Sequence, residues 1–139
     1  MSQSIVKNYL HITFSTKNRN PIIDKEIQPK LFSYMSGICA SLESYAYQIG
    51  GVEDHVHILC NLSKKITLIK FMEEVKKSSS KWMKTQGEKY SEFYWQDGYG
   101  AFSVNPSEIE IVKAYILNQE ERHKTMTFKE ELSRVFRKI

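Results

Sequence analysis

The hydrophobic positions along the chain repeat with two different periods, and each period predicts one kind of element. Apolar and polar residues alternate over 5–16, which places Leu10, Ile12 and Phe14 on one side of a predicted strand. Over 27–41 the apolar residues recur three and four positions apart, which is typical of a helix with one buried side. The first third of the chain is therefore expected to form a strand followed by a helix.

The middle of the chain shows the same two patterns again. Residues 45–49 resume a strand, which Gly50-Gly51 is expected to loosen. The pair Glu53-Asp54 indicates a turn into a further strand over 55–62, and two adjacent strands favour an antiparallel hairpin. A second long helix is predicted from Thr67 to about Thr85.

The last third supplies a final strand and further helices. A strand is predicted over 99–104, after the turn signal Asp97-Gly98. The stretch 105–108 has the residues of a helix start with a capping box, so we expect one helix over 106–122 and a last helix from Thr127. This order of elements predicts an α+β fold of the ferredoxin-like type: an antiparallel sheet with helices on one face and additional C-terminal helices.

Length and composition fit a single folded domain over 1–139. Of the 139 residues, 41% are hydrophobic and 26% are charged, which allows a sizeable core and argues against disorder. Cys39 and Cys60 lie in apolar contexts and form neither a disulfide framework nor a CxxC motif. The N-terminus lacks the build of a signal peptide and no apolar run reaches membrane-spanning length, so we expect a cytoplasmic protein without membrane contact.

The charge balance is mildly basic and favours a polyanionic partner. Lys and Arg number 20 against 16 Asp and Glu, which gives a formal net charge of +4. On the helix predicted over 67–85, a rotation of about 100° per residue places several lysines opposite the apolar side. These residues are Lys70, Lys77, Lys81 and Lys84. Both a solvated helix face and a phosphate-binding face explain this lysine stripe.

The most specific chemistry lies in the stretch from Asp54 to His57. Successive side chains of a strand point to opposite faces, so His55 and His57 share one face and Val56 takes the other. From a surface or cleft, the two imidazoles could hold one metal ion between them. Two half-buried histidines with hydrogen-bond partners explain the same short motif. A zinc site that adds Cys60 is disfavoured, because Cys60 falls on the opposite strand face.

A second pair of polar side chains shares one face of the helix predicted over 106–122. Tyr115 and Gln119 are four residues apart, which separates them by only about 40° around the helix axis. Together with His55 and His57, this pair resembles the HUH single-tyrosine transposases, the IS200-like enzymes of small bacterial insertion sequences that move as single-stranded DNA.

The resemblance extends over nearly the whole chain. The matching stretches are Phe14–Lys17 with Arg19, Asp54–His57, Trp95–Val104, Tyr115–Gln119 with His123, and Thr127–Glu131. Each motif is weak alone, and their order and spacing make the combination specific. The resemblance implies a ferredoxin-like fold, a homodimer, single-stranded DNA with hairpin ends as the partner, and no nucleotide cofactor.

The residue types agree with the chemistry that the resemblance implies. Mg²⁺ or Mn²⁺ held by His55, His57 and Gln119 would neutralise a nonbridging phosphate oxygen. Tyr115 would displace the 3′ oxygen and form a 5′-phosphotyrosine link, which a free 3′ hydroxyl could later reverse. This transesterification needs neither ATP nor water. The resemblance also implies that the tyrosine can act in the partner subunit's site.

The sequence fits two other interpretations as well. A domesticated relative would use the same site on chromosomal hairpins without mobilising its own gene. A basic ferredoxin-like nucleic-acid-binding protein would keep the histidines as structural residues. His11 and His123 are expected to be structural or surface residues. The candidates for contacts to a DNA backbone are Lys17, Arg19, Lys70, Lys77, Lys81 and Lys84.

Overall fold

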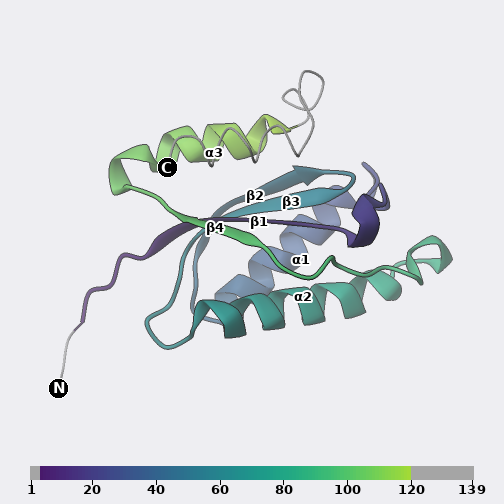
Figure 1. Cartoon of the computed structure of the whole chain (residues 1–139), viewed down its shortest axis with the longest axis horizontal. Coiled ribbons are helices and arrows are strands. Elements are labelled where there is room, and N and C mark those ends of the chain that lie inside the picture. Colours follow the sequence, from purple (N-terminus) through teal and green to yellow (C-terminus); the bar gives the residue numbers. More distant parts are fainter. Residues whose placement is uncertain (1–3, 120–139) are drawn as a thin grey trace.

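A four-stranded antiparallel sheet organises the chain in the computed structural model, which describes residues 4–119 (Figure 1). The strands are β1 (Tyr9–Ser15), β2 (Ala46–Val52), β3 (His55–Asn61) and β4 (Gly100–Ser103). They lie in the order β2-β3-β1-β4, and each neighbouring pair is antiparallel. This is the α+β, ferredoxin-like arrangement that the order of elements predicts.

Helices cover both faces of this sheet. They are α1 (Gln28–Ser41), α2 (Leu68–Lys84) and α3 (Ile109–Leu117). Figure 1 shows α1 and α2 on one face and α3 on the other. The first two helices therefore fulfil the prediction of helices on one face, and α3 is the additional C-terminal helix. Within residues 4–119, no helix combines the length and apolarity needed to cross a membrane.

The main core lies between the sheet and the helix pair α1 and α2. The β1–β3 register sets Ile12 opposite Ile58 and Phe14 opposite Val56, so the apolar positions of both strands meet on this face. Each of these side chains is almost fully buried, which contributes roughly 1.5–3 kcal/mol per residue to folding. The helices add Leu31, Met35, Cys39, Phe71, Met72, Val75 and Met83.

Several predicted boundaries are wrong by a few residues. The first strand begins at Tyr9 rather than Ile5, because the ladder pairs Tyr9 with Asn61, the last residue of β3. The final strand is limited to Gly100–Ser103. The prediction that Gly50-Gly51 loosens its strand is also wrong, since β2 continues through both glycines to Val52.

The third helix differs most from its prediction. Pro106–Glu108 forms a separate 3-10 turn, whose Asn105 side chain accepts a hydrogen bond from the Ser107 backbone N–H at 3.0 Å. The predicted N-cap Asn105 and the proline after it are thus confirmed, but they start this 3-10 turn, and α3 itself begins after Glu108, whose side chain makes no cap. The helix ends at Leu117. The predicted continuation past Leu117 is therefore wrong at Asn118, which is the C-cap, so Gln119 lies beyond the end of α3. Residues 120–122, the residue His123 and the last helix from Thr127 lie outside the described residues.

α3 packs closely against the sheet at Gly50. A Cβ atom at Gly50 would lie 2.9 Å from both the backbone oxygen and Cγ2 of Ile116. A Cβ at the neighbouring Gly51 would overlap the carbonyl oxygen of His55. The two glycines thus remain inside β2 because close packing excludes a side chain at each. Gly50 pairs with His57, so α3 crosses the sheet beside that histidine.

We expect Gly50→Ala to lower the free energy of unfolding by about 1–3 kcal/mol, because the added methyl group must displace Ile116. Gly37 provides the matched control: it is exposed in α1, and a Cβ there meets no atom within 4 Å. Gly37→Ala should raise the same free energy by about 0.5–1 kcal/mol. Urea unfolding followed by circular dichroism measures both. A Gly50→Ala protein as stable as the wild type would contradict this placement of α3.

Candidate active site

His55 and His57 lie on the sheet face that α3 covers. Both extend from β3 to this face as strand alternation predicts, while Val56 points into the main core. Their exposed fractions are 0% and 2%. The expectation that the two imidazoles face a surface or cleft is therefore wrong, because α3 packs across β2 and β3. The pair belongs to a buried polar site.

His55 is held between two side-chain oxygens. Its Nδ1 lies 2.8 Å from Oδ1 of Asp54, and its Nε2 lies 3.2 Å from Oε1 of Gln119. The carboxylate accepts a hydrogen bond from Nδ1–H, so in a neutral imidazole Nε2 is the nitrogen with a lone pair. Asp54 itself lies near Arg19, whose Nε is 3.8 Å from Oδ2. A carboxylate behind an imidazole is the usual support of a metal-binding histidine.

Gln119 presents its oxygen to this histidine. Its Nε2 donates to the backbone oxygen of Tyr115 at 3.3 Å, which directs Oε1 towards His55, and the side chain is 1% exposed. An amide oxygen only accepts, so the contact at 3.2 Å is a hydrogen bond when Nε2 of His55 carries a proton. When Nε2 carries the lone pair, Nε2 and Oε1 are both available as ligands, and a divalent cation would satisfy both.

His57 is also held through Nδ1. That atom lies 2.8 Å from Nε2 of His11, and the ring centroids of His55 and His57 are 5.1 Å apart. Each imidazole would therefore present Nε2 to a metal. Within residues 4–119, no three His, Cys, Asp or Glu side chains form a metal-binding group. The amide oxygen of Gln119 lies beside Nε2 of His55, so His55, His57 and Gln119 are the candidate ligands of a divalent metal.

Tyr115 lies beside the two histidines of its own chain. Its ring centroid is 5.8 Å from that of His57 and 5.8 Å from that of His11, with the rings edge-on. The phenol is half-buried, in contrast to the histidines. The structure thus brings together all four residues that the sequence singled out for a metal and a nucleophile: His55, His57, Tyr115 and Gln119.

Sequence analysis missed two contributors to this site. Asp54 was assigned to a turn, although its place directly before His55 put a carboxylate within reach of that imidazole. For His11 the sequence predicts a structural or surface residue, and its structural contact is with His57. Strand alternation could have indicated that His11 lies on the histidine side of the sheet, because His11 shares with Tyr9 and Thr13 the face of β1 opposite the main core.

Cys60 takes no part in the site. It points into the main core on the side of α1 and α2, as does Cys39. Burial raises the pKa of both thiols to about 12, so neither is a thiolate at neutral pH. These observations agree with the parity argument against a zinc site made of the two histidines and Cys60.

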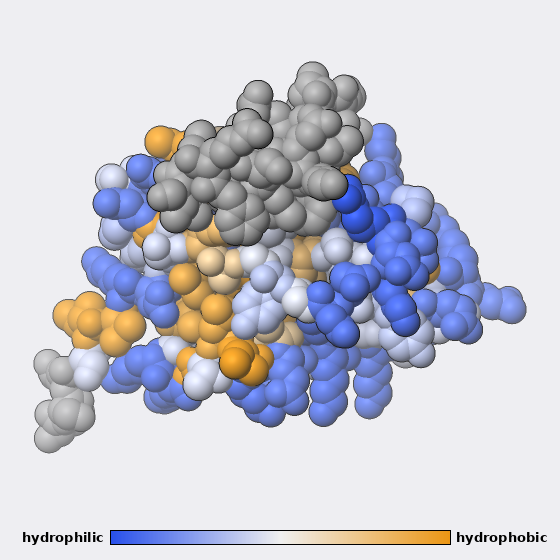
Figure 2. All heavy atoms as spheres, in the orientation of Figure 1, coloured by the Kyte–Doolittle hydropathy of each residue, from blue (hydrophilic) through white to orange (hydrophobic). Residues whose placement is uncertain are grey.

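The lysine stripe lies on the far side of the sheet from the histidines. Lys77 and Lys81 are exposed on α2, and Figure 2 shows hydrophilic residues along the edge that this helix occupies. Lys70 is exposed as well and forms an ion pair with Glu74 at 3.2 Å. Because α2 and α3 cover opposite faces, these lysines are remote from the imidazoles (Figure 1).

Lys84 departs from the stripe. Its Nζ donates to the backbone oxygen of Phe93 at 2.7 Å and to Oγ of Ser80 at 2.8 Å, and it lies 4.1 Å from the ring centroid of Tyr94. The prediction of an outward-facing amine is therefore wrong for this residue. Lys84 instead fixes the connector that leads to β4 against α2. Cation–π contact further ties it to Tyr94.

Lys17 and Arg19 are the predicted DNA-contacting residues nearest the site. Both belong to an exposed 3-10 turn, Lys17–Arg19, directly after β1. The Thr16 backbone N–H donates to the carbonyl oxygen of Asp54 at 2.9 Å, which joins this turn to the start of β3. Lys17 Nζ lies 5.8 Å from the ring centroid of Tyr94.

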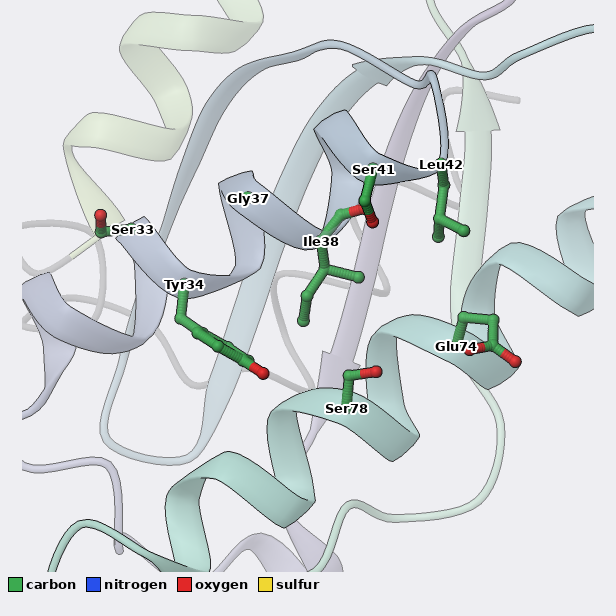
Figure 3. Close-up of a pocket in the computed structure, with 8 residues that line it drawn as sticks. All are labelled: Ser33, Tyr34, Gly37, Ile38, Ser41, Leu42, Glu74 and Ser78. Carbon is green, nitrogen blue, oxygen red and sulfur yellow. The ribbon is translucent and has the colours of Figure 1, made fainter.

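A hollow of about 470 Å³ opens between α1 and α2 (Figure 3). Small residues line much of it, with Tyr34 at one end and Glu74 at the other. The Tyr34 ring stacks on Trp82, with ring centroids 4.8 Å apart. The sheet separates this hollow from the histidines, so it is distinct from the candidate active site.

Comparisons with known proteins agree with the fold and the motifs. A search of curated proteins finds no match. A solved candidate transposase from Deinococcus radiodurans aligns with a TM-score of 0.66 and 19% identity, over 86% of this chain and 98% of its own. A REP-associated tyrosine transposase, solved bound to a REP hairpin, aligns with a TM-score of 0.63 and 14% identity, over 96% of this chain and 87% of its own.

At these identities the two solved structures support the fold alone. The sequence match supports the family as well as the fold. The family model described as "Transposase IS200 like" matches residues 4–119, a range that includes the histidine pair, Tyr115 and Gln119. The chain therefore belongs to the IS200-like transposase family.

Proposed function

We propose that this protein cleaves and rejoins single-stranded DNA through a covalent 5′-phosphotyrosine intermediate, as the transposase of a small insertion sequence. The observation that carries the proposal is the gathering of Tyr115 with His55, His57 and Gln119 around one small volume. Family membership supports transposase activity in general. The hairpin bound by the REP-associated relative supports a DNA hairpin as partner.

His55 and His57 would hold a divalent ion through Nε2, and Gln119 through Oε1. When bound, Mg²⁺ or Mn²⁺ supplies positive charge that neutralises a nonbridging phosphate oxygen and makes phosphorus more electrophilic. Asp54 keeps His55 in the tautomer that this role needs, because its carboxylate only accepts hydrogen bonds. Burial of all three ligands makes their interaction with the substrate charge stronger than it would be in water.

Tyr115 is the proposed nucleophile. Its phenolic oxygen forms a bond to phosphorus while the bond from phosphorus to the 3′ oxygen breaks, and the phenolic proton ends, in net terms, on the released 3′ hydroxyl. One phosphodiester replaces another, so the step is close to reversible. The nearly complete burial of the histidines and Gln119 limits attack by water on the phosphotyrosine. The half-buried phenol marks the side from which a phosphate enters.

The DNA strand would reach this side past the turn after β1. Lys17 and Arg19 are exposed there, next to the Asp54 turn. Tyr94 is 52% exposed and lies close to the amines of Lys17 and Lys84, so its ring offers a stacking surface for a base. We also propose a homodimer. The edge-on contact of Tyr115 with His57 of its own chain supports attack in cis.

We expect Tyr115→Phe to abolish a covalent protein–DNA adduct, because phenylalanine has no attacking oxygen. Wild-type protein, Mn²⁺ and single-stranded oligonucleotides that carry the flanks of its own gene should give a complex that survives SDS, and EDTA should prevent it. Tyr45→Phe is the matched control, since Tyr45 is 65% exposed and remote from the histidines in the β2–β3 register. It should form the adduct normally.

An adduct that persists in Tyr115→Phe would show that another residue is the nucleophile. The non-catalytic nucleic-acid-binding alternative makes the opposite prediction: binding without any adduct, unchanged by EDTA and by His55→Ala. A wild-type protein with these properties would overturn the proposed activity.

We expect Lys17→Ala to reduce the steepness with which DNA affinity falls as salt rises. Loss of one phosphate contact to single-stranded DNA should reduce the slope of log affinity against log salt by about 0.7. Lys64→Ala is the control, because Lys64 is exposed beyond the opposite end of β3 and should leave the slope unchanged. Fluorescence anisotropy at several salt concentrations measures both. Equal slopes for the two variants would remove Lys17 from the DNA path.

A further inference from the structure

We propose that His11 is a positioning residue that sets the tautomer of His57, and through it the ability of His57 to bind a metal. The inference rests on the proposed function, because it takes His57 as a ligand. Its evidence is direct contact: Nε2 of His11 lies 2.8 Å from Nδ1 of His57, and the two ring centroids are 5.0 Å apart.

The sheet holds His11 in this place. β1 lies between β3 and β4, so His11 has neighbours on both sides: Leu59 across one ladder and Phe102 across the other. Its ring centroid lies 6.5 Å from that of Phe102. His57 pairs with Thr13, two residues along β1 from His11 and on the same face. The two imidazoles are therefore diagonal neighbours on the adjacent central strands β1 and β3, and the register between these strands fixes their contact.

The chemistry of neutral imidazole allows only one useful arrangement. One ring nitrogen carries the proton and the other carries a lone pair. If His57 ligates through Nε2, its proton is on Nδ1, and Nδ1–H donates to His11 Nε2. His11 must then carry its own proton on Nδ1. If His11 donates instead, the proton of His57 moves to Nε2, and that nitrogen can no longer bind a metal.

This arrangement differs from the support of His55. The Asp54 carboxylate only accepts, so it fixes the tautomer of His55 in one direction. An imidazole can accept or donate, so the direction of the His11–His57 hydrogen bond distinguishes a metal-binding His57 from one that cannot bind. His11 also contacts the ring of Tyr115 at 5.8 Å, and a test must therefore separate loss of the acceptor from loss of packing.

The pair of variants His11→Gln and His11→Leu makes this separation. Glutamine can place an acceptor oxygen near the position of Nε2, whereas leucine fills the space without an acceptor. Calorimetry of the full chain with Mn²⁺ should show about 10–100-fold weaker binding for His11→Leu and affinity near wild type for His11→Gln. Nitrogen-15 NMR of the metal-free protein should find the His57 proton on Nδ1 in the wild type, and displaced towards Nε2 in His11→Leu.

Unchanged Mn²⁺ affinity and an unchanged His57 tautomer in His11→Leu would overturn the proposal. A purely structural role would weaken both variants alike and leave the tautomer where it is. If the wild type binds no Mn²⁺, the metal step of the proposed function fails, while the metal-free NMR measurement still tests His11. Should His11→Leu not fold, a wild-type His57 with its proton on Nε2 would by itself refute the assignment.

Discussion

The close contact of α3 with β2 at Gly50 determines the geometry of the whole site. Because glycine has no Cβ, the backbone of Ile116 rests on the strand directly beside the position paired with His57. Tyr115 precedes Ile116, and Gln119 follows it by three residues, so one anchored turn delivers a phenol and an amide to the imidazoles. A larger residue at position 50 would push Ile116 away from β2, and Tyr115 and Gln119 would then move away from the imidazoles together.

The same contact creates a demand for hydrogen-bond partners. The packing of α3 on the sheet buries two imidazoles and an amide. Each buried polar atom without a hydrogen-bond partner would lower the free energy of unfolding by about 1–3 kcal/mol. Asp54 and His11 meet part of this demand through the Nδ1 atoms. These contacts also fix how each ring is oriented before any substrate arrives. Folding and chemistry thus place the same requirement on these residues, which explains why polar side chains occupy an otherwise closed interior.

Local pattern was enough to predict the antiparallel strands, α1, α2 and the shared face of His55 and His57, because strand parity and helical spacing act over a few residues. It could not predict that α3 closes this face, since apolar spacing identifies a buried side but not the surface it packs on. Gly50 was misjudged for a related reason: local propensity counts the flexibility of glycine, whereas its value here is a contact with Ile116, distant in sequence. His11 required the β1–β3 register, which the sequence alone does not specify.

The basic residues differ in whether their charged groups already have partners within the protein. Arg19 lies beside the carboxylate that supports His55, so its loss would disturb this histidine as well as any phosphate contact. Lys84 is committed to the Phe93 carbonyl oxygen and the Tyr94 ring. Within residues 4–119 the amine of Lys17 makes no such hydrogen bond, and the turn that carries it lies beside the start of β3. Charge alone is therefore not enough to choose among these residues for the proposed DNA path, and the exposure and existing contacts of each amine favour Lys17.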